Sequence, residues 1–292
     1  MPQAFITRRG GKQEFIPYQE LFDASGTMTA PEDGTYRIIV VGAGADGGGY
    51  AADTSDTWTG GAWACAGGCG GGGYVDIAMK KGQTATITIS DDGSVSVLID
   101  GSVVIKATKG SITGTYSNVK PLAGSVTGEN VTPFPSNGTN TSSIALPEAL
   151  NDPESLSSGG ESGLYSSNGS SSSVTSTRRE KTSGGGAFGG DGGIGGDAVV
   201  VSANSNYYVG TSAGTSGSRG AGDGSGGNVQ DTGFGSVVGY SGQAGGGGGG
   251  GYGGGGGAGT THYNRINSST TYYYVDKGGT GGKACAVIKR IA

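Results

Sequence analysis

The chain has little cysteine, little histidine and few apolar residues. Its 292 residues include three cysteines and one histidine, and 33% of them are hydrophobic, so any apolar core is thin. Three cysteines, Cys65, Cys69 and Cys285, do not make a disulfide framework, and we expect buried free thiols instead. A zinc site of these cysteines with His262 is the less favoured interpretation. We therefore expect no metal and no cofactor.

Long hydrophobic runs are also missing. No segment approaches the length of a membrane span, which predicts no membrane insertion. Residues 1–14 lack the apolar stretch of roughly 7–15 residues that a signal peptide requires, so we expect synthesis in the cytoplasm without a signal peptide. No heptad pattern appears, which excludes a coiled-coil stalk within the sequence.

Positive charge is in deficit. Acidic residues outnumber basic residues by 23 to 18, giving a formal net charge of −5. A nucleic-acid-binding surface needs an excess of Lys and Arg. The pairs Arg8–Arg9 and Arg178–Arg179 are too short to form basic patches. The sequence thus predicts no nucleic-acid partner.

What the chain does have is glycine. Glycine makes up 67 of 292 residues, about 23%, against a usual share of roughly 7%. Glycine loses the most backbone freedom on ordering and has no side chain to bury, so such tracts cannot be ordinary helix or strand interior. The densest tracts are residues 42–49, 67–73, 184–196 and 245–259.

The glycine tracts adjoin apolar, β-prone runs. Residues 35–41 (TYRIIVV) lead directly into Gly42. In the reverse sense, glycine leads into residues 74–79 (YVDIAM), 198–201 (AVVV) and 284–288 (ACAVI). A flexible linker, the usual interpretation of Gly-rich sequence, has no reason to adjoin a strand in this way four times.

The alternative to a linker is a bundle of extended polyglycine-II helices. Such a helix has about three residues per turn and no internal hydrogen bonds, so its N–H and C=O groups point outward. Ordering a residue costs about 1–2 kcal/mol, whereas each hydrogen bond contributes about 0.5–1.5 kcal/mol. A single glycine helix is therefore unstable, and a bundle is stable only if adjoining β-sheet fixes its ends and most backbone groups are paired. We favour the bundle because strands adjoin the tracts.

The remaining sequence predicts strands, turns and a long polar insertion. Residues 84–89 alternate with period two, and Asp100–Gly101 is a two-residue hairpin loop between strands 94–99 and 102–107. Residues 111–183 are rich in Ser, Thr, Asn and Pro, with one short helix candidate at 147–150. We expect an all-β fold: a jelly-roll-like β-sandwich with packed polyglycine-II helices and long polar loop insertions. We expect residues 1–20 to be a docking arm and residues 21–292 to be the domain, with residues 111–183 as a polar insertion.

Motifs typical of enzymes are weak. Residues 42–47 (GAGADG) satisfy G-x-G-x-x-G, but the glycine that follows cannot sustain the helix that a dinucleotide-binding site requires. His262 lies in a polar segment with no nucleophile elbow to make a Ser/His/Asp arrangement. Paired carboxylates for glycoside cleavage are not presented convincingly by any segment. We predict that the protein is not an enzyme and has no catalytic residues.

Two polar segments between glycine tracts carry side chains suited to binding. Both tryptophans of the chain fall in the loop 50–66, and a second loop, 260–277, concentrates tyrosine. Tyr and Trp give large rigid contact area, and Ser and Asn give adaptable hydrogen bonding, as in antibody paratopes. The alternative is that these aromatics cap the glycine bundle and fill gaps within it. The receptor-binding candidates are Tyr50, Trp58, Trp63, His262, Tyr263, Arg265, Tyr272, Tyr273 and Tyr274.

Several motifs resemble the glycine-rich domain of bacteriophage and prophage tail proteins. They are residues 22–31 (FDASGTMTAP), 34–44 (GTYRIIVVGAG), 70–77 (GGGGYVDI), 81–89 (KGQTATITI) and 278–291 (GGTGGKACAVIKRI). The resemblance covers residues 22–110 and 184–292, and implies a protein of the fibre or baseplate tip. No catalytic residues transfer with it.

We therefore expect a tail-tip or tail-fibre adhesin of the virion, which attaches to the host surface through loops on a glycine-rich scaffold. The partners would be tail fibre or baseplate proteins and a host cell-surface receptor, either a glycan or an outer-surface protein. A homotrimer is one assembly compatible with this role. The alternative is a purely structural component of the tail or baseplate that touches no receptor. Ice binding is disfavoured because it needs regular flat faces.

Overall fold

The fold is all-β, as the sequence predicts. The computed structural model describes residues 18–51, 62–65, 67–114, 120–134, 173–174, 198–203, 206–211, 239–243, 252–256, 261–265, 271–275 and 280–292. Within these ranges there is no helix, and every pair of neighbouring strands is antiparallel.

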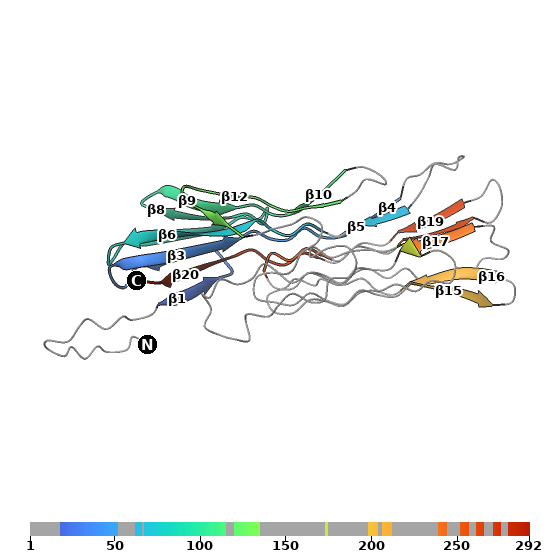
Figure 1. The fold of residues 1–292 in the computed structure, drawn as a ribbon, viewed down its shortest axis with the longest axis horizontal. Coiled ribbons are helices and arrows are strands. Elements are labelled where there is room, and N and C mark those ends of the chain that lie inside the picture. Colours follow the sequence, from blue (N-terminus) through green and yellow to red (C-terminus); the bar gives the residue numbers. More distant parts are fainter. Residues whose placement is uncertain are drawn as a thin grey trace.

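Two five-stranded sheets form a sandwich, seen on the left of Figure 1. The first has the order β1-β20-β3-β6-β13 and the second the order β12-β9-β8-β7-β2. In the second sheet, three consecutive strands run as a meander, so the jelly-roll topology stays a prediction. The first sheet comprises β1 (Gln19–Phe22), β20 (Cys285–Arg290), β3 (Gly34–Val41), β6 (Gly72–Met79) and β13 (Thr132–Pro133). The second comprises β12 (Val126–Thr127), β9 (Ser102–Ala107), β8 (Val95–Ile99), β7 (Thr84–Ile89) and β2 (Gly26–Thr29).

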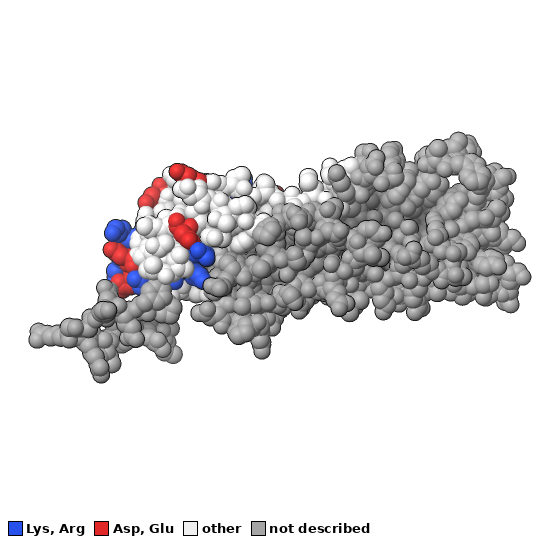
Figure 2. Space-filling view, in the orientation of Figure 1, with Lys and Arg blue, Asp and Glu red and all other residues white. Residues whose placement is uncertain are grey.

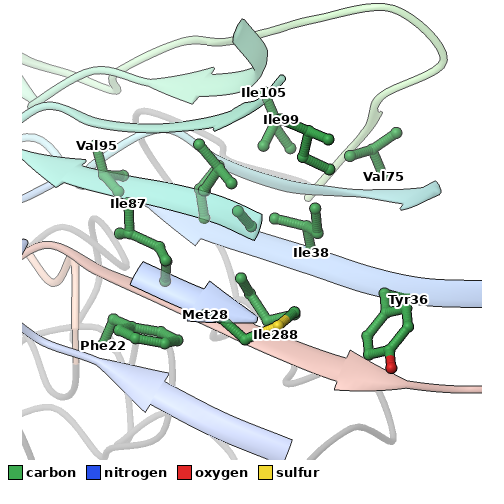
Figure 3. Close-up of a cluster of buried hydrophobic side chains, with 14 of the residues drawn as sticks. Phe22, Met28, Tyr36, Ile38, Val75, Ile87, Val95, Ile99, Ile105 and Ile288 are labelled. Carbon is green, nitrogen blue, oxygen red and sulfur yellow. The ribbon is translucent and has the colours of Figure 1, made fainter. Parts of the chain in front are cut away.

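Alternating apolar residues of both sheets fill the space between them. In β7, Ala85 and Ile87 are buried while their neighbours Thr84 and Thr86 are exposed, the period-two pattern of a strand with one face in the core. Tyr36 is fully buried, and its hydroxyl donates to the carbonyl oxygen of Glu32 at 2.8 Å. Large members of this core include Phe22, Met28, Tyr36, Ile38, Ile87, Ile99, Ile105 and Ile288 (Figure 3).

The outer face of the first sheet carries a second, smaller apolar cluster. Ile39 and Val41 of β3 lie there with Cys285 and Val287 of β20, and Phe134 completes it. Strand β3 is therefore buried on both faces close to its glycine end, which explains why its sequence is continuously apolar there. Tyr74 and Tyr252 pack against the cluster as partly buried residues.

The glycine segments that leave the sandwich are bonded to one another laterally. Residues 67–71, which precede β6, are an example. The amide nitrogens of Gly67 and Gly70 donate to the carbonyl oxygens of Gly256 and Gly253, at 2.9 and 2.8 Å. The two donors are three residues apart and their acceptors are also three apart, so one neighbour is met once every three residues.

The same spacing recurs toward two other neighbours of this segment. Gly68 and Gly71 donate to Ser111 and Thr108, whereas their carbonyl oxygens accept from Ala45 and Gly42. A β-strand meets its neighbours with period two in one plane, whereas a helix of three residues per turn directs its groups to several sides. The segments 42–46, 67–71, 253–256 and 281–283 thus bond as the predicted polyglycine-II bundle does. Further bonds join Gly44 to Gly282, Gly256 to Ala45, Gly282 to Gly254, Gly253 to Lys283, Gly110 to Ala43 and Gly124 to Cys69.

Close approach of backbones explains the need for glycine in these segments. At Gly44 a β-carbon would meet the carbonyl oxygen of Gly254, and at Gly70 that of Gly42, in both cases well inside 3.0 Å. Because the β-carbon would collide with backbone atoms of the neighbouring segment, the collision cannot be relieved by rotation of a flexible side chain. The missing side chains therefore allow the lateral hydrogen bonds to form.

Two of the three cysteines lie where the bundle meets the sheet. Cys69, within a glycine segment, and Cys285, at the start of β20, are buried and belong to no disulfide, as predicted for them. Burial raises the pKa of the Cys69 thiol to about 11 and raises that of Cys285 well above its usual value. Both thiols are therefore protonated at neutral pH, and neither is an activated nucleophile.

Several local predictions are confirmed. All four glycine junctions lead into or out of a strand, namely β3, β6, β20 and β15 (Ala198–Ala203). The hairpin loop has positive φ at both positions, 51° at Asp100 and 78° at Gly101, and joins β8 to β9. This is the conformation that a two-residue loop of the primed type requires.

Other predictions meet a different structure or fall outside it. Of the docking arm, residues 19–20 belong to β1 and pair with β20, and residues 1–17 lie outside the described residues. The beginning of the polar insertion belongs to the fold: residues 111–122 contain the hairpin of β10 (Ser111–Thr113) and β11 (Lys120–Leu122), while β12 and β13 extend the two sheets. The helix candidate at 147–150 lies outside the described residues.

Candidate recognition surface

The first predicted binding segment forms a hairpin on a pair of glycine segments. Residues 42–47 lead into β4 (Gly48–Ala51), and β5 (Ala62–Cys65) leads back toward residues 67–71. The register sets Tyr50 directly opposite Trp63. Directly opposed residues of an antiparallel pair share one face, so these two candidates lie on the same face of the hairpin. Trp58, the third candidate in this segment, lies outside the described residues.

The second predicted binding segment is placed in the same way. Strands β18 (Thr261–Arg265) and β19 (Thr271–Val275) lie in the chain between the glycine segments 253–256 and 281–283. They belong to a four-stranded sheet in the order β14-β17-β18-β19. The remaining members of this sheet are β14 (Ser173–Val174) and β17 (Gly239–Gln243).

The register of β18 and β19 sorts the candidates onto two faces. His262 pairs with Tyr274, and Tyr263 pairs with Tyr273. Asn264 pairs with Tyr272 and shares a face with His262, because residues two apart along a strand share a face. The three consecutive tyrosines are thus divided: Tyr272 and Tyr274 lie on one face of the sheet, and Tyr273 on the other together with Arg265.

The structure brings the two segments together. Strand β5 contacts both β18 and β19, and β4 contacts β19. Figure 1 shows these strands at the end of the molecule away from the sandwich. Two aromatic-rich segments separated by about two hundred residues of sequence therefore meet at one end, because the glycine segments that carry them are hydrogen-bonded neighbours, as at Gly67 and Gly256.

The prediction that these segments are loops is wrong for their described residues, which are strands. The tyrosines and threonines of TTHYN and TTYYYV favour a pleated conformation, and pairing between strands fixes it. Polar composition between glycine tracts suggested a loop, but a sheet with hydrophilic faces has the same composition.

Further aromatic residues at this end were not among the predicted candidates. Hairpin β15–β16 (β16, Asn206–Thr211) carries Tyr207 and Tyr208, and β16 contacts β17. Tyr240 of β17 pairs with Asn264 and so shares the face of His262, Tyr272 and Tyr274. Each of these tyrosines lies in a short run of the sequence flanked by Gly, Ser or Asn, which is the signal that could have identified them.

The opposite end of the molecule is charged and holds both ends of the described domain. Figure 2 shows Lys, Arg, Asp and Glu side chains gathered at the free end of the sandwich. There Lys81 pairs with Glu32 at 3.0 Å, and Lys80 lies 3.5 Å from Asp33. A hydrogen bond from the amide nitrogen of Lys81 to Asp33 lowers the pKa of that carboxyl group. Exposed pairs of this kind contribute little to stability.

One ordered charge pair lies on the outer face of the first sheet. Arg37 makes two hydrogen bonds of 2.8 Å to the carboxylate of Asp76, its cross-strand partner, and lies 4.2 Å from the ring centre of Tyr74. Such a bidentate pair is partner-specific and fixes the side chains on this face. It extends the apolar cluster of Ile39 and Val41 toward the charged end.

The described residues gather no other recognisable site. They contain no group of three or more His, Cys, Asp or Glu side chains placed to hold a metal ion. They also contain no helix of the length and apolarity that a membrane span needs. The aromatic strands β4, β5, β18 and β19 are therefore the candidate recognition surface.

Comparisons of the chain with protein-family models, with curated proteins and with solved structures find no match. The resemblance to tail proteins of bacteriophages stays a prediction that rests on the sequence motifs alone.

Proposed function

We propose that the protein is an adhesin of a bacteriophage tail tip or tail fibre, and that it attaches the virion to the host surface through the strands at the far end of its glycine bundle. The observation that carries this proposal is the meeting of β4–β5 with β18–β19 at that end. Each hairpin is carried by laterally bonded glycine segments, so the scaffold presents both at a fixed distance from the sandwich.

Rigid presentation is the physical advantage of such a scaffold. A binding element that is ordered before it meets its target loses less entropy on binding. The six residues 42–47 join β3 to β4, and with a rise of about 3.1 Å per residue they place β4 on the order of 20 Å from the end of β3. Tyr and Trp suit this surface because they offer contact area with few rotatable bonds.

The other end is suited to attachment within the virion. The amide nitrogen of Arg290 donates to the carbonyl oxygen of Tyr18, and that of Thr35 donates to Ala292. Residues 18 and 292 thus lie at the charged end, away from the aromatic strands (Figure 1). We propose that this end, with the arm of residues 1–20, contacts tail fibre or baseplate proteins, and that the virion is where the protein works.

Replacement of Tyr272, Tyr273 and Tyr274 by Ala tests the adhesin function. We expect the purified variant to keep its thermal unfolding transition and to bind host cells at least about tenfold more weakly, because buried aromatic anchors dominate binding energy. The control replaces the exposed Val103 of β9, in the sandwich, by Ala. Unchanged adsorption of the triple variant would place the binding surface elsewhere.

The second candidate is a structural component of the virion without receptor contact. The contacts of β5 with β18 and β19 favour it, because aromatic residues on these strands would then cap the bundle. Purified protein that never binds host cells, but is required for particle assembly, would establish this role and refute the adhesin. In both roles we propose non-covalent binding without catalysis, so incubation with host polysaccharide should leave its length unchanged.

A further inference from the structure

The second sheet of the sandwich ends in β2, whose outer edge is open. Among the described residues, β2 pairs with β7 alone. The amide nitrogen of Ala30 donates to the carbonyl oxygen of Gln83, which continues the β7 register, at 2.8 Å. Backbone groups alternate in direction along an antiparallel strand, so those of Met28 also face β7, whereas those of Thr27 and Thr29 face away from the sheet. The side chain of Met28 is buried in the core (Figure 3), and both threonine side chains are exposed.

Hydrogen bonds hold β2 in place at both ends. At its beginning, the hydroxyl of Ser25 accepts from the amide nitrogen of Ile89 at 2.8 Å and donates to the carbonyl oxygen of the same residue at 3.1 Å. After its last residue, the carbonyl oxygen of Ala30 accepts from the amide nitrogen of Gly82 at 2.8 Å. The strand is therefore ordered before any partner binds, which lowers the entropy lost on binding.

The edge of β2 lacks the features that usually protect edge strands. Proteins discourage pairing at an edge with a charged residue, a proline, a bulge or a very short strand. In the other three edge strands of the sandwich, β1 carries the exposed Glu20, β13 contains Pro133, and β12 has only two residues. Strand β2 has four residues, none charged and none proline, and its pairing with β7 has no register shift.

We propose that the edge of β2 is an interface at which two copies of this chain pair in antiparallel orientation, about a two-fold axis at Met28. A two-fold interface must be self-complementary, and the sequence of residues 26–30 (GTMTA) is almost the same in both directions. Thr27 of each copy then lies opposite Thr29 of the partner subunit. The outward groups of these residues can form four backbone hydrogen bonds, and the side chains form two Thr–Thr pairs.

Other registers form fewer bonds. An axis at Thr29 sets Thr27 opposite Pro31, which has no amide hydrogen. An axis at Thr27 sets Thr29 opposite Ser25, which lies in the bend between β1 and β2. Residues 24–31 are uncharged, so the net charge of −5 on each copy is not concentrated at the interface.

The concentration dependence of the molecular mass tests the interface. One pair of edges buries less than the roughly 1,200 Å² of a stable complex, so we expect a dissociation constant on the order of 0.1 mM. Sedimentation equilibrium of the full-length protein should show monomers and dimers in exchange. A protein that stays monomeric up to about 1 mM would overturn the proposal. A trimer would also overturn it, because a two-fold interface closes after two copies.

Charge variants test which edge pairs. In Thr27→Glu/Thr29→Glu, two pairs of glutamates oppose each other across the axis, and in Thr27→Lys/Thr29→Lys two pairs of lysines do. Like charges directly opposite repel, so each variant should dimerise at least about tenfold more weakly than the parent. An equal mixture should form heterodimers, since Glu then opposes Lys. Variants that dimerise like the parent, or a mixture that does not pair, would overturn the proposal.

The matched control is Thr84→Glu/Thr86→Glu on β7, the neighbouring strand. It adds the same charge to exposed threonines of the same sheet, but its carboxylates would lie three strand spacings, about 14 Å, from those of the partner. That distance exceeds the Debye length of about 8 Å at physiological ionic strength. The control should therefore dimerise like the parent. All three variants should keep the unfolding temperature of the parent within a few degrees, as for exposed residues.

Amide exchange tests the backbone bonds. In the described part of the chain the amides of Thr27 and Thr29 have no acceptor, so they should exchange rapidly in dilute solution and several-fold more slowly in concentrated solution. The amide of Met28 should be protected in both. A dimer in which the two threonine amides still exchange rapidly would use another surface and refute the proposal. The inference is independent of the adhesin function, because β2 belongs to the sandwich and not to the candidate recognition surface.

Discussion

The sandwich of this protein is stabilised by buried side chains, whereas the glycine bundle can form only where side chains are absent. In the sandwich, side chains such as Ile38, Ile87 and Ile105 are completely buried between two sheets. In the bundle, backbones approach so closely that Gly44 and Gly70 have no room for a β-carbon. Strand β3 belongs to both regions, because its chain continues from Val41 in the sheet into Gly42 in the bundle.

The difference makes the bundle dependent on the sandwich. Each lateral hydrogen bond contributes about 0.5–1.5 kcal/mol, which does not exceed the cost of about 1–2 kcal/mol for ordering a residue. Apolar burial in the sandwich, at about 25 cal/mol per Å², supplies the stability that the bundle lacks. Strands β3, β6 and β20 hold the ends of three glycine segments at fixed spacing, so the bonds form between segments that are already aligned.

The largest effect should come from adding two methyl groups to the bundle. The double variant Gly44→Ala/Gly70→Ala should not yield folded protein, because each β-carbon meets a backbone carbonyl oxygen that cannot move aside. Each such overpacking costs about 1–3 kcal/mol or more, a large part of the usual 5–15 kcal/mol. Circular dichroism and solubility after expression measure the outcome.

The control for this variant is Gly82→Ala. Gly82 has a φ of 85° but open space around it, so only the strain of a left-handed residue, about 1–2 kcal/mol, is expected. A double variant as stable as this control would show that the segments can move apart, which contradicts a tightly bonded bundle.

A smaller effect should follow from removing atoms from the sandwich. Ile105→Ala should lower the free energy of unfolding by about 2–5 kcal/mol, and Ile105→Val by about 0.5–1.5 kcal/mol, as usual for a buried isoleucine. If the sandwich aligns the bundle, both regions should unfold in one transition in urea. Two separated transitions would show that the bundle is independently stable.

The smallest effect is expected from acid. Hydrogen bonds from the hydroxyl and amide of Ser94 lower the pKa of Asp92, and the amide of Lys81 lowers the pKa of Asp33. Because the folded-state pKa values lie below the ordinary value of 3.8, the stabilisation is complete above that pH and is lost as the pH falls through the lowered values.

Thermal unfolding between pH 7 and pH 2.5 checks this expectation. The unfolding temperature should fall below about pH 4, and Asp92→Asn should reduce that fall. Both carboxylates lie in turns of the sandwich, so we expect acid to destabilise the sandwich first and the bundle to unfold together with it. An Asp92→Asn variant with the same acid sensitivity as the parent would contradict the assigned cause.

The sequence predicted what depends on neighbouring residues. The runs that enter or leave glycine became strands β3, β6, β15 and β20, and Asp100–Gly101 became the hairpin loop because positive φ is cheap there. The glycine content also predicted that the glycine segments form hydrogen bonds with one another. It did not predict which segments are bonded, since nothing in the sequence near Gly67 indicates Gly256 as its acceptor.

The recognition surface was predicted by residue type but not by structure. Aromatic content identified residues 50–66 and 260–277, yet the described parts are paired strands, because β-propensity and cross-strand pairing outweighed polar composition. The division of Tyr272 and Tyr274 from Tyr273 depends on register. Register is a property of two strands together and cannot be predicted from one.

Amide hydrogen exchange resolved by residue tests the central claim most directly, that the glycine segments are ordered by lateral hydrogen bonds. The bonded amides of Gly42, Gly44, Gly67, Gly70, Gly253 and Gly256 should exchange as slowly as those of β3 and β20, since they can open only when the bundle opens. Exchange of these amides at the rate of an unstructured chain, while the strands stay protected, would contradict the account.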